Sequence, residues 1–370
     1  MSRPGVIFGG PSPEHDISIL TGLMAARALT TSAQEVHCLY WSKGGDWHLV
    51  PADLEGDDFA DGVPRGSSPV RLVVGPGGGF VGAGALRKER PLDLSAVLNC
   101  CHGAPGEDGT LQGALDLAGI AHGGPSAAGA ALGMDKLAFG ALVVATGLPS
   151  LSRALVEPVD GWAPAFPGPY IVKPRFGGSS IGIEVVADAA AVGALMRNSI
   201  HLRNGAVVEP YRAGADEVQI AVRAFPELQV SNLLRPKRSA ASGEIYSYKE
   251  KYVPGEGMHA AQGEIDPELP AGVAPALQAA AKTLAVVARV RGVARVDFLL
   301  EGDQWFVNEI NTIPGSLAKH LWVNPAVPVI TLVNDVLAEA VQRSASAAWT
   351  TAGADGTALR SAGSIAGKLG

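Results

Sequence analysis

Cysteine is scarce in this sequence of 370 residues, which contains only Cys38, Cys100 and Cys101. Three cysteines at this spacing form neither a disulfide framework nor a set of zinc ligands, so disulfide-rich secreted folds and zinc modules are excluded. The adjacent pair Cys100 and Cys101 lies in an apolar run, and we therefore expect buried thiols in a reducing compartment.

Long hydrophobic runs and clusters of positive charge are missing as well. No apolar run approaches the about 20 residues that a membrane span requires. The first residues, MSRPGVIFGG, pass into a strand-like run without the pattern of a signal peptide. The net charge of −7 and the lack of a Lys/Arg block disfavour binding to nucleic acid phosphates. We therefore expect a soluble cytoplasmic protein whose partners are neither membranes nor nucleic acids.

Apolar residues, by contrast, are abundant and regularly arranged. They make up 47% of the chain, which is ample for buried cores in two or three domains. In the first third, the strand-like runs 5–10 and 94–104 each end in small residues, and the helical patterns 18–30 and 109–120 follow them. This βαβ order predicts a parallel sheet that binds ligands at the carboxyl ends of its strands.

The remaining two thirds predict two smaller α+β units. A helix is expected over 126–150, where the pattern stops at Gly-Leu-Pro, and several short strands follow it. A second helix over 275–292 leads into two strands and a last helix over 327–343. The fold class is therefore α/β. The predicted units are 1–125, 126–234, 235–345 and a loosely ordered tail, 346–370, rich in Ala, Gly, Ser and Thr.

The segment NEINTIPGSLAKHL, residues 308–321, has the densest polar residues of the predicted strands. Because side chains alternate along a strand, Glu309 and Asn311 share one face. By the same rule, Arg295 and Asp297 share a face of the preceding strand. If a three-residue loop joins the two strands, Asp297 lies opposite Glu309, whereas a two-residue loop would offset them.

Two carboxylates and an amide oxygen on one face of a sheet would repel each other without a cation. Hard oxygen ligands of this kind suit Mg²⁺, which in proteins also binds water and substrate phosphates. The alternative is a solvated face that binds nothing. Because Asp297 and Glu309 lie within very apolar strands, the pattern favours the metal site.

Three polar loops are candidates for binding anions and substrates. In 171–186, a flexible loop after Lys173 offers backbone N–H groups and hydroxyls to phosphate. It is not a Walker A loop, and a plain hairpin turn is the alternative. The loops 9–22 and 102–113 each follow a predicted strand, so they should meet at the carboxyl edge of the parallel sheet. For Glu14, capping of the following helix is the alternative to ligand binding.

These motifs, in this order, resemble the D-alanine–D-alanine ligase family of the ATP-grasp superfamily over about residues 5–340. The matching motifs are GGPSPEHDIS, HGAPGEDGTLQG, MDK, VKP…GSSIG, EKY, RVDF and NEINTIPG. One short motif would be weak, whereas seven at family-like spacing are hard to reconcile with chance. The resemblance implies an ATP-grasp architecture, in which an N-terminal parallel-sheet domain precedes two α+β domains that enclose ATP.

The resemblance also implies a reaction. ATP phosphorylates the carboxylate of a first amino acid, the amine of a second attacks the acyl phosphate, and a dipeptide, ADP and phosphate leave. Phosphorylation supplies the leaving group that a carboxylate lacks, so the protein's task is alignment and charge neutralisation. Members of the family make D-alanyl-D-alanine for cell-wall peptidoglycan, and they are commonly homodimers.

The residues implied for ATP and its metal ions are carried over from the family motifs one by one. The ligands of two Mg²⁺ ions, with Mn²⁺ as an alternative, are Asp297, Glu309 and Asn311. The contacts to phosphates are Lys136, Lys173 and Lys251. The contacts to adenine and ribose are Glu209, the backbone of Tyr211 and Arg212, and Glu217.

The residues implied for the amino acids lie in the remaining motifs. The ammonium group of the first amino acid is bound by Glu14 with help from His102. The negative charge on the acyl oxygen is stabilised by Arg295 and the backbone amide of Gly315. The hydrogen-bonded set that closes the site is Glu14, Ser179 and Tyr252. A mobile lid over 246–262 keeps water from the acyl phosphate.

The chain departs from the family where the second amino acid is expected to bind. After the Pro-Gly turn the family carries a serine followed by leucine, and the serine binds the second carboxylate. Here the pair is His320 and Leu321, so His320 or Lys319, as a cation, would replace the serine. Gly177 and the glycine-rich lid also depart from the family pattern.

Three functions are open on the sequence. The first is ligation of two D-alanine molecules, and the second is an amide ligase of a biosynthetic pathway with a different second substrate. Retention of Tyr252 argues against the lactate-using relatives of the family. The third, an ATP-binding regulator without catalysis, is disfavoured because the metal triad and Arg295 are retained.

Overall fold

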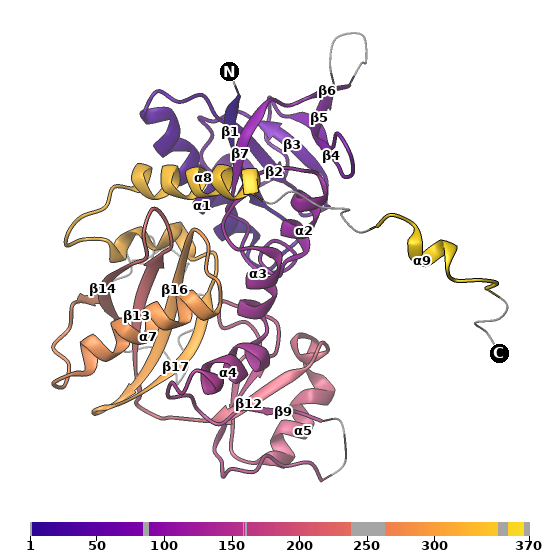
Figure 1. Ribbon diagram of the computed structural model, residues 1–370. Helices are drawn as coiled ribbons and strands as arrows, with labels where there is room; N and C mark the ends of the chain where they lie inside the picture. The colour runs from indigo at the N-terminus through magenta and orange to yellow at the C-terminus, as the bar shows by residue number, and fades with distance from the viewer. Residues whose placement is uncertain are drawn as a thin grey trace.

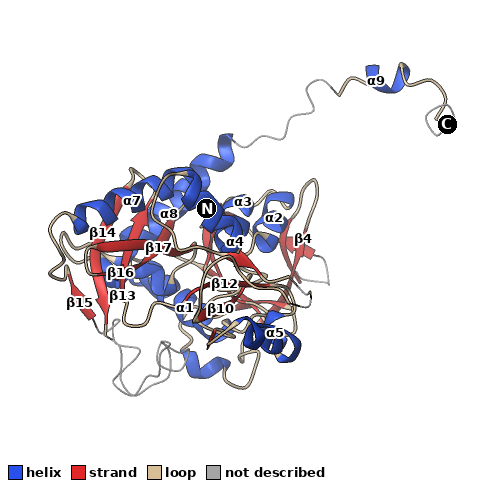
Figure 2. Cartoon of the chain, turned by 90° about the horizontal axis from the view of Figure 1, so that it is seen from below, coloured by secondary structure: helices blue, strands red, loops and turns tan. Residues whose placement is uncertain are grey.

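The computed structural model describes residues 2–83, 89–157, 159, 161–237, 263–346 and 354–365. These residues form three β-sheets with helices beside them, and Figure 1 shows the sheets in three lobes. In the view of Figure 2, helices flank the strands of the lobes. The predicted α/β fold class is confirmed.

The first sheet has eight strands in the order β6-β5-β4-β3-β2-β1-β7-β8. Its strands are β1 (Arg3–Gly9), β2 (His37–Trp41), β3 (Trp47–Val50), β4 (Ser68–Val73), β5 (Gly79–Ala83), β6 (Glu89–Pro91), β7 (Leu94–Asn99) and β8 (His122–Gly123). β1 pairs in parallel with β2 and β7, and β7 pairs in parallel with β8, so the predicted parallel sheet is confirmed. The other neighbouring strands are antiparallel and extend this sheet.

Helices from both ends of the chain cover the first sheet. α1 (His15–Thr31) and α2 (Thr110–Leu117) follow β1 and β7, as the βαβ pattern predicts, and the 3-10 helix η1 (Gly56–Phe59) packs on α1. α8 (Val329–Ser346), which the sequence places in the third unit, packs against α1, β7 and β8. Its Leu332 is fully buried in the same core as Val6. The last long helix therefore completes the N-terminal core (Figure 1).

The second sheet has four strands in the order β11-β10-β12-β9 and is antiparallel throughout. Its strands are β9 (Ala154–Leu155), β10 (Tyr170–Pro174), β11 (Glu184–Val186) and β12 (Ala206–Pro210). α5 (Ala189–Asn198) and the 3-10 helix η3 (Ile200–Leu202) lie beside them. The glycine-rich loop after Lys173 connects β10 to β11, so it is a hairpin connection that also faces the candidate site.

A break at Asp135 divides the single helix that the sequence predicts over 126–150. The structure has two helices there, α3 (Ala127–Met134) and α4 (Lys136–Ala145). Asp135 takes an extended backbone conformation, and its side chain accepts hydrogen bonds from two N–H groups in the first turn of α4. This cap fixes where α4 begins, and with it the position of Lys136.

The third sheet has five strands in the order β15-β14-β13-β16-β17. Its strands are β13 (Asp216–Arg223), β14 (Gln229–Pro236), β15 (Gly263–Ile265), β16 (Val293–Glu301) and β17 (Gln304–Asn311), and α7 (Val273–Val287) packs on β13 and β14. The predicted boundary at residue 234 falls inside β14. β13, which lies before that boundary, pairs with β16 along its whole length, so the sheet contains residues from both sides of it.

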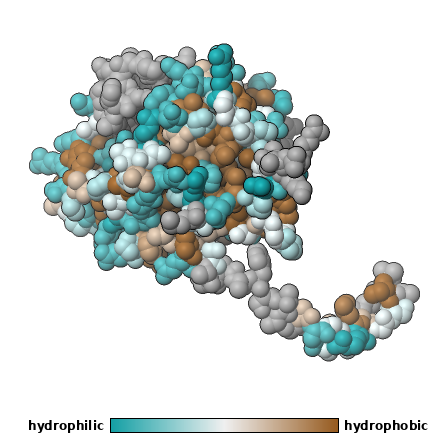
Figure 3. Space-filling view, turned by 90° about the horizontal axis from the view of Figure 1, so that it is seen from above, coloured by the Kyte–Doolittle hydropathy of each residue, from teal (hydrophilic) through white to brown (hydrophobic). Residues whose placement is uncertain are grey.

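Two short helices follow the third sheet. The 3-10 helix η4 (Gly315–Leu321) joins β17 to α8, and α9 (Thr357–Arg360) lies in the described part of the tail, apart from the three lobes in Figures 1 and 2. Within the described ranges, none of the helices combines the length and apolar character that a bilayer crossing needs. Figure 3 shows hydrophilic and hydrophobic residues interspersed on the face seen from above.

Candidate active site

The β16–β17 hairpin brings the predicted metal ligands together. Asp297 pairs with Glu309 and Arg295 pairs with Asn311, so all four side chains lie on one face, and the predicted pairing is confirmed. The sequence left the turn open between two and three residues, and because Glu301 pairs with Gln304, two residues form it.

A β-bulge restores the pairing that a two-residue turn would offset. Phe298 pairs with Val307, whereas Asp297 pairs with Glu309, so Asn308 is an extra residue in β17. The bulge lies directly beside the candidate metal ligands. Asn308 also accepts hydrogen bonds from Lys173 of β10 and from Arg153, which precedes β9.

Asp297 is the most deeply buried of these polar side chains, with 2% of its surface exposed. Arg295 Nε lies 2.6 Å from one of its oxygens and Nη2 lies 2.7 Å from the other, while Asn311 Nδ2 donates across 3.2 Å. Burial raises the pKa of Asp297 to about 6, Arg295 opposes this, and Glu217 and Glu309 raise it further. Arg295 therefore offsets only part of the cost of burying the Asp297 carboxylate.

The donor set fits a hard divalent cation. It consists of two carboxylates and an amide, and such oxygen donors suit Mg²⁺. Among the described residues, no group of three His, Cys, Asp or Glu side chains forms a metal cluster by itself. Any metal held at this hairpin would therefore use the amide of Asn311 together with Asp297 and Glu309, and a bound triphosphate or water would supply the other ligands.

Two buried lysines face the hairpin from the second sheet and α4. Lys136 is 7% exposed, its Nζ donates to the carbonyl of Gly177, and it lies 3.7 Å from Glu309 Oε2. Burial lowers the pKa of Lys136, and Glu309 opposes this effect. Lys173 is 5% exposed and donates to Glu209 Oε2 across 2.7 Å. The predicted phosphate-binding lysines thus lie on the side of the hairpin that carries the carboxylates.

Arg153 joins this cluster, although no sequence motif contains it. Its Nε lies 2.5 Å from Glu209 Oε1, its Nη1 donates to the carbonyl of Lys136, and its Nη2 donates to the carbonyl of Asn308 across 3.2 Å. Burial alone would raise the pKa of Glu209, but Lys173 and Arg153 outweigh it and leave this pKa below its ordinary value. An isolated arginine in a loop gives no periodicity or spacing from which this contact could be predicted.

The predicted adenine hinge is the segment that connects the second sheet to the third. The N–H of Tyr211 donates to the carbonyl of Pro169 across 2.8 Å. Arg212 is exposed and lies 3.7 Å from Glu301. Glu217, at the start of β13, accepts a hydrogen bond from Gln219 across 2.7 Å. The predicted hinge residues therefore lie between the second sheet and the third, and the third sheet also contains the β16–β17 hairpin with the candidate metal ligands.

The loops that follow β1 and β7 meet at the carboxyl edge of the first sheet, as predicted. A Cβ atom added to Gly103 would lie 2.8 Å from Glu14 Oε2, and one added to Gly178 would lie 3.0 Å from it. The Glu14 side chain makes no capping bond to α1, which argues against the capping alternative. Instead, Ser179 Oγ donates to Glu14 Oε1. Lys251 and Tyr252 lie outside the described residues, as does the predicted lid.

His102 lies in the loop that follows β7, and its burial keeps it neutral. Burial lowers its pKa to about 4, a hydrogen bond to the backbone of Ile313 opposes this, and Arg295 lowers it further. Its Nε2 lies 2.9 Å from Thr21 Oγ1, which accepts a hydrogen bond from the N–H of Ser316 across 3.1 Å. His102 and Thr21 therefore connect the first-substrate loops to η4.

Three consecutive residues of η4 have left-handed backbone geometry. The φ angles of Ser316, Leu317 and Ala318 are 50°, 52° and 49°. Side chains in this region cost of order 1–3 kcal/mol each, so neighbouring structure must hold the turn. Leu317 and Ala318 are buried in the N-terminal core, and Ser316 is bonded to Thr21. A Cβ added to Gly315 would meet no described atom within 4 Å, so there is space beside its backbone.

Lys319, His320 and Leu321, which lie where the family carries its serine and leucine, differ in burial and charge. Burial lowers the pKa of His320 to about 4, with Arg295 and Lys319 adding to the effect, so a cationic role for His320 is not supported. Its Nε2 is buried and has no hydrogen-bond partner among the described residues. Lys319 is exposed, whereas the side chain of Leu321 is fully buried in the core. Any contact of Leu321 with substrate would therefore come from its backbone.

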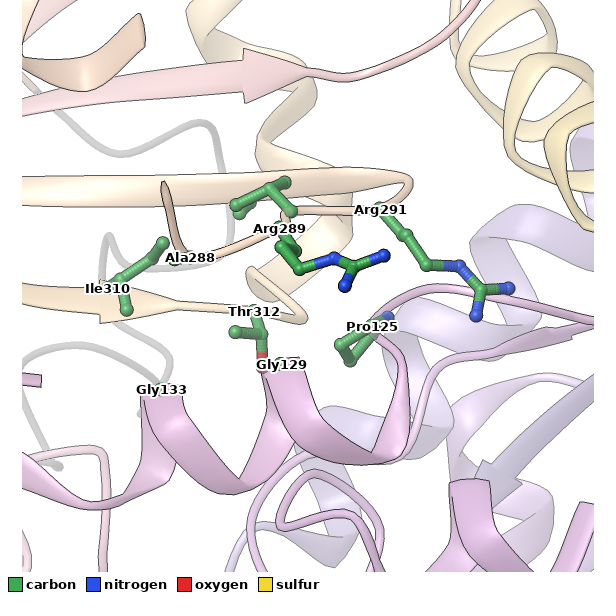
Figure 4. Close-up of a pocket in the computed structure, with 10 residues that line it drawn as sticks. Pro125, Gly129, Gly133, Ala288, Arg289, Arg291, Ile310 and Thr312 are labelled. Atoms are coloured by element: carbon green, nitrogen blue, oxygen red, sulfur yellow. The ribbon is translucent and has the colours of Figure 1, made fainter. Parts of the chain in front are cut away.

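A cavity behind β17 is too small to be the substrate site. It lies between α3 and the β16–β17 hairpin, and Figure 4 shows Ile310 and Thr312 on its wall with Arg289 and Arg291 beside it. Its volume is about 10 Å³, which is room for about one water molecule. Ile310 and Thr312 alternate with Asn311, so this cavity lies on the face of β17 opposite the carboxylates.

Fold and site together define an ATP-grasp ligase, an enzyme that activates a carboxylate with ATP. Two α+β lobes set buried lysines against facing carboxylates, and the parallel-sheet lobe adds Glu14 to the same region. The family models for the N-terminal and C-terminal parts of D-ala D-ala ligases match residues 3–125 and 156–338. The chain therefore belongs to the D-alanine–D-alanine ligase family, whose members are ATP-dependent, dipeptide-forming enzymes.

Individual relatives agree with this assignment along nearly the whole chain. The D-alanine–D-alanine ligase of Methylobacterium sp. (strain 4-46) is 33% identical over 366 residues, 93% of each chain. The solved D-alanine–D-alanine ligase of Coxiella burnetii has a TM-score of 0.74 at 21% identity, covering 94% of this chain and 97% of its own. The Bacillus anthracis enzyme, solved with ATP, has a TM-score of 0.66 at 20% identity, covering 94% and 100%. The predicted ATP-grasp fold is confirmed.

Proposed function

We propose that this protein joins two molecules of D-alanine with ATP as the energy source, for peptidoglycan synthesis in the cytoplasm. The observation that carries the proposal is the register of the β16–β17 hairpin, which sets Asp297 opposite Glu309 beside buried Lys136. Family membership, with relatives named for this reaction, supports the choice of D-alanine.

ATP is proposed to bind between the second and third sheets. Its adenine and ribose would lie at the segment after β12, and its phosphates would lie between the lysines and the hairpin. The residues proposed for adenine and ribose are Glu209, Tyr211, Arg212 and Glu217. The residues proposed for the phosphates are Lys136, Lys173 and Lys251, the last of which lies outside the described residues.

Asp297, Glu309 and Asn311 are proposed to hold two Mg²⁺ ions. The raised pKa of Asp297 supports this, because burial disfavours its charged form even with Arg295 beside it, and a bound cation would stabilise that charge. When bound, the ions would neutralise charge on the phosphates. If this is correct, removal of divalent cations with a chelator should abolish activity, and Mg²⁺ should restore it.

The first D-alanine is proposed to bind through its ammonium group to Glu14, whose carboxylate Ser179 holds in place. Its carboxylate would then point toward the phosphates. Arg295, fixed by two contacts to Asp297, and the backbone N–H of Gly315 would stabilise the negative charge on the acyl oxygen. Tyr252 and the lid complete this proposal but lie outside the described residues.

The second D-alanine is proposed to bind at η4. Lys319 is the cation available to its carboxylate, because His320 is neutral. The amine of this second molecule attacks the acyl phosphate, an amide bond forms, the carbon–oxygen bond to phosphate breaks, and the amine loses a proton. A homodimer, as in the family, is proposed as the assembly, and light scattering would test it.

The direct test measures ADP release and identifies products by mass spectrometry. With ATP, Mg²⁺ and D-alanine, ADP should appear together with D-alanyl-D-alanine, whereas L-alanine should give neither. A panel of second amino acids, each offered with D-alanine, serves as the control for substrate choice. If the dipeptide forms only with another second amino acid, or if D-alanine releases no ADP, the proposed substrate pair is wrong.

A further inference from the structure

Arg153 lies at the centre of the candidate ATP site without belonging to any of its predicted groups. Its side chain is 7% exposed, and it precedes β9 in a loop with no recognisable motif. Its three hydrogen bonds reach Glu209 at the end of β12, the carbonyl of Lys136 at the start of α4, and the carbonyl of Asn308 in the bulge of β17. One guanidinium thus connects three elements that carry proposed ATP ligands.

A glycine in α4 makes room for this guanidinium. A Cβ atom added to Gly140 would lie 3.0 Å from Arg153 Cζ and still closer to Nη1. Glycine inside a helix is unfavourable relative to alanine, so its presence at this position needs a packing reason. The space occupied by Arg153 supplies that reason.

Arg153 also affects how Lys173 divides its hydrogen bonds between Glu209 and Asn308. Glu209 has two carboxylate oxygens, and Arg153 occupies Oε1 while Lys173 occupies Oε2. The same Lys173 Nζ reaches Asn308 Oδ1 across 3.0 Å, so both cations connect β12 to the bulge residue. Without Arg153, Glu209 would attract Lys173 alone, and Lys173 would be drawn away from the hairpin.

Arg153 and Lys173 both bond to Glu209 and to Asn308, and these two residues lie at opposite ends of the proposed ATP site. Beyond Glu209 the chain continues into the hinge segment, and beyond Asn308 it continues into Glu309. We propose that Arg153 is a positioning residue that fixes the distance between the nucleotide hinge and the metal-binding end of β17. Nucleotide affinity therefore depends on Arg153 although Arg153 acts only through its neighbours. This inference rests on the proposed location of ATP.

The test compares Arg153→Met with Arg153→Lys in the full chain. Calorimetry would give the Kd for ADP with Mg²⁺, and steady-state assays would give the KM values for ATP and D-alanine. We expect Arg153→Met to raise the Kd and the ATP KM about tenfold, with the D-alanine KM nearly unchanged. Arg153→Lys should recover part of the loss, because an ammonium group can still pair with Glu209.

A purely structural role for Arg153 would give a different pattern. The melting temperature would fall in both variants while the Kd for ADP stayed at the wild-type value, and that result would overturn the inference. Because Arg153→Met removes a partner of a buried carboxylate, the double variant Arg153→Met/Glu209→Gln provides a folded comparison if the single variant is unstable. Because Glu209 is itself a proposed adenine contact, this double variant is compared with Glu209→Gln alone, and it should bind ADP more weakly than that single variant.

Gly140 offers an independent test that leaves Arg153 in the chain. Gly140→Ala should displace the guanidinium and weaken ADP binding, whereas in the Arg153→Met background the same change should have little effect. The matched control is Gly193→Ala in α5, where the added Cβ would lie 3.5 Å from Arg197 Nη1, an ordinary contact. Equal effects of Gly140→Ala in both backgrounds would contradict the inference. Because ADP binding is read without D-alanine, these results are independent of the proposed substrate pair.

Discussion

In the β16–β17 hairpin the backbone is regular apart from one bulge, and buried Asp297 lies against the guanidinium of Arg295. In η4, only a few residues further along the chain, three consecutive residues have left-handed φ angles and a buried nitrogen of His320 lacks a partner among the described residues. The hairpin is held by sheet hydrogen bonds and paired charges of its own. The turn is held by contacts to the N-terminal core.

This difference shows which contacts hold the hairpin in place and which hold η4 in place. The hairpin needs its own lobe and the cations beside it, whereas η4 depends on Thr21 and on Glu107, which accepts hydrogen bonds from Thr312 and from the N–H of Ile313. The proposed second-substrate site is thus assembled between domains. Substitutions in the two regions should therefore affect different quantities.

The largest effect is expected in the hairpin. Asp297→Asn removes a proposed metal ligand, and we expect kcat to fall by roughly 10²–10³ because charge stabilisation in the transition state is lost. The melting temperature should stay close to that of the wild type, since a carboxylate with a raised pKa is itself unfavourable in the folded state. ADP release and thermal unfolding would measure the two quantities. Asp303→Asn in the turn of the same hairpin is the control, and equal activities of the two variants would contradict the prediction.

The second effect is on the pH dependence of stability, and it concerns Glu107, which bonds to the segment between β17 and η4. Burial, with Glu14 adding to it, raises the pKa of Glu107 from 4.5 to about 7, although backbone hydrogen bonds from Gly103 and Ile313 oppose this. The folded state therefore keeps a proton that the unfolded state releases. The stability from this group is fully present below about pH 4.5 and is lost as the pH rises to about 7, a change of about 3 kcal/mol.

Glu107→Gln should remove this pH dependence. Urea unfolding of both proteins at pH 5 and pH 8 would give four free energies of unfolding, and the wild type should lose more stability between these pH values than the variant. Glu268→Gln, which removes an exposed carboxylate, serves as the matched control. An identical loss in wild type and Glu107→Gln would show that Glu107 is ionised in the folded protein at both pH values.

The smallest effect is expected in the turn. Thr21→Val removes the hydroxyl that Ser316 and His102 contact, at a cost of about 1–2 kcal/mol. We expect the KM for the second D-alanine to rise about tenfold while the ATP KM is unchanged. Thr21→Ser should behave as the wild type, and Thr283→Val in α7 is the matched control for loss of a helical hydroxyl. A rise in the ATP KM instead would mean that Thr21 does not act through η4.

Regular patterns made much of the fold predictable. Alternation along β16 and β17 correctly placed Asp297, Glu309 and Asn311 on one face, and strand-end loops correctly predicted the meeting of Glu14 with the second loop. The sequence left the turn open between two and three residues, because a bulge at Asn308 leaves no trace in an apolar–polar pattern. The prediction of one helix over 126–150 was wrong for a related reason. The sequence does not show whether Asp135 lies inside a helix or caps one, and its hydrogen bonds to the first turn of α4 decide for the cap.

The sequence by itself pointed to the family, the βαβ order of the first unit, the main strands and helices of the other two units, and the residue types at the proposed ATP, metal and first-substrate positions. These follow from local spacing, which a chain carries whatever its tertiary fold. Only the tertiary structure decided that α8 packs on the first sheet, that Arg153 reaches Glu209, and that burial makes His320 neutral. Packing and desolvation depend on residues brought together from distant parts of the chain, and no local pattern records them.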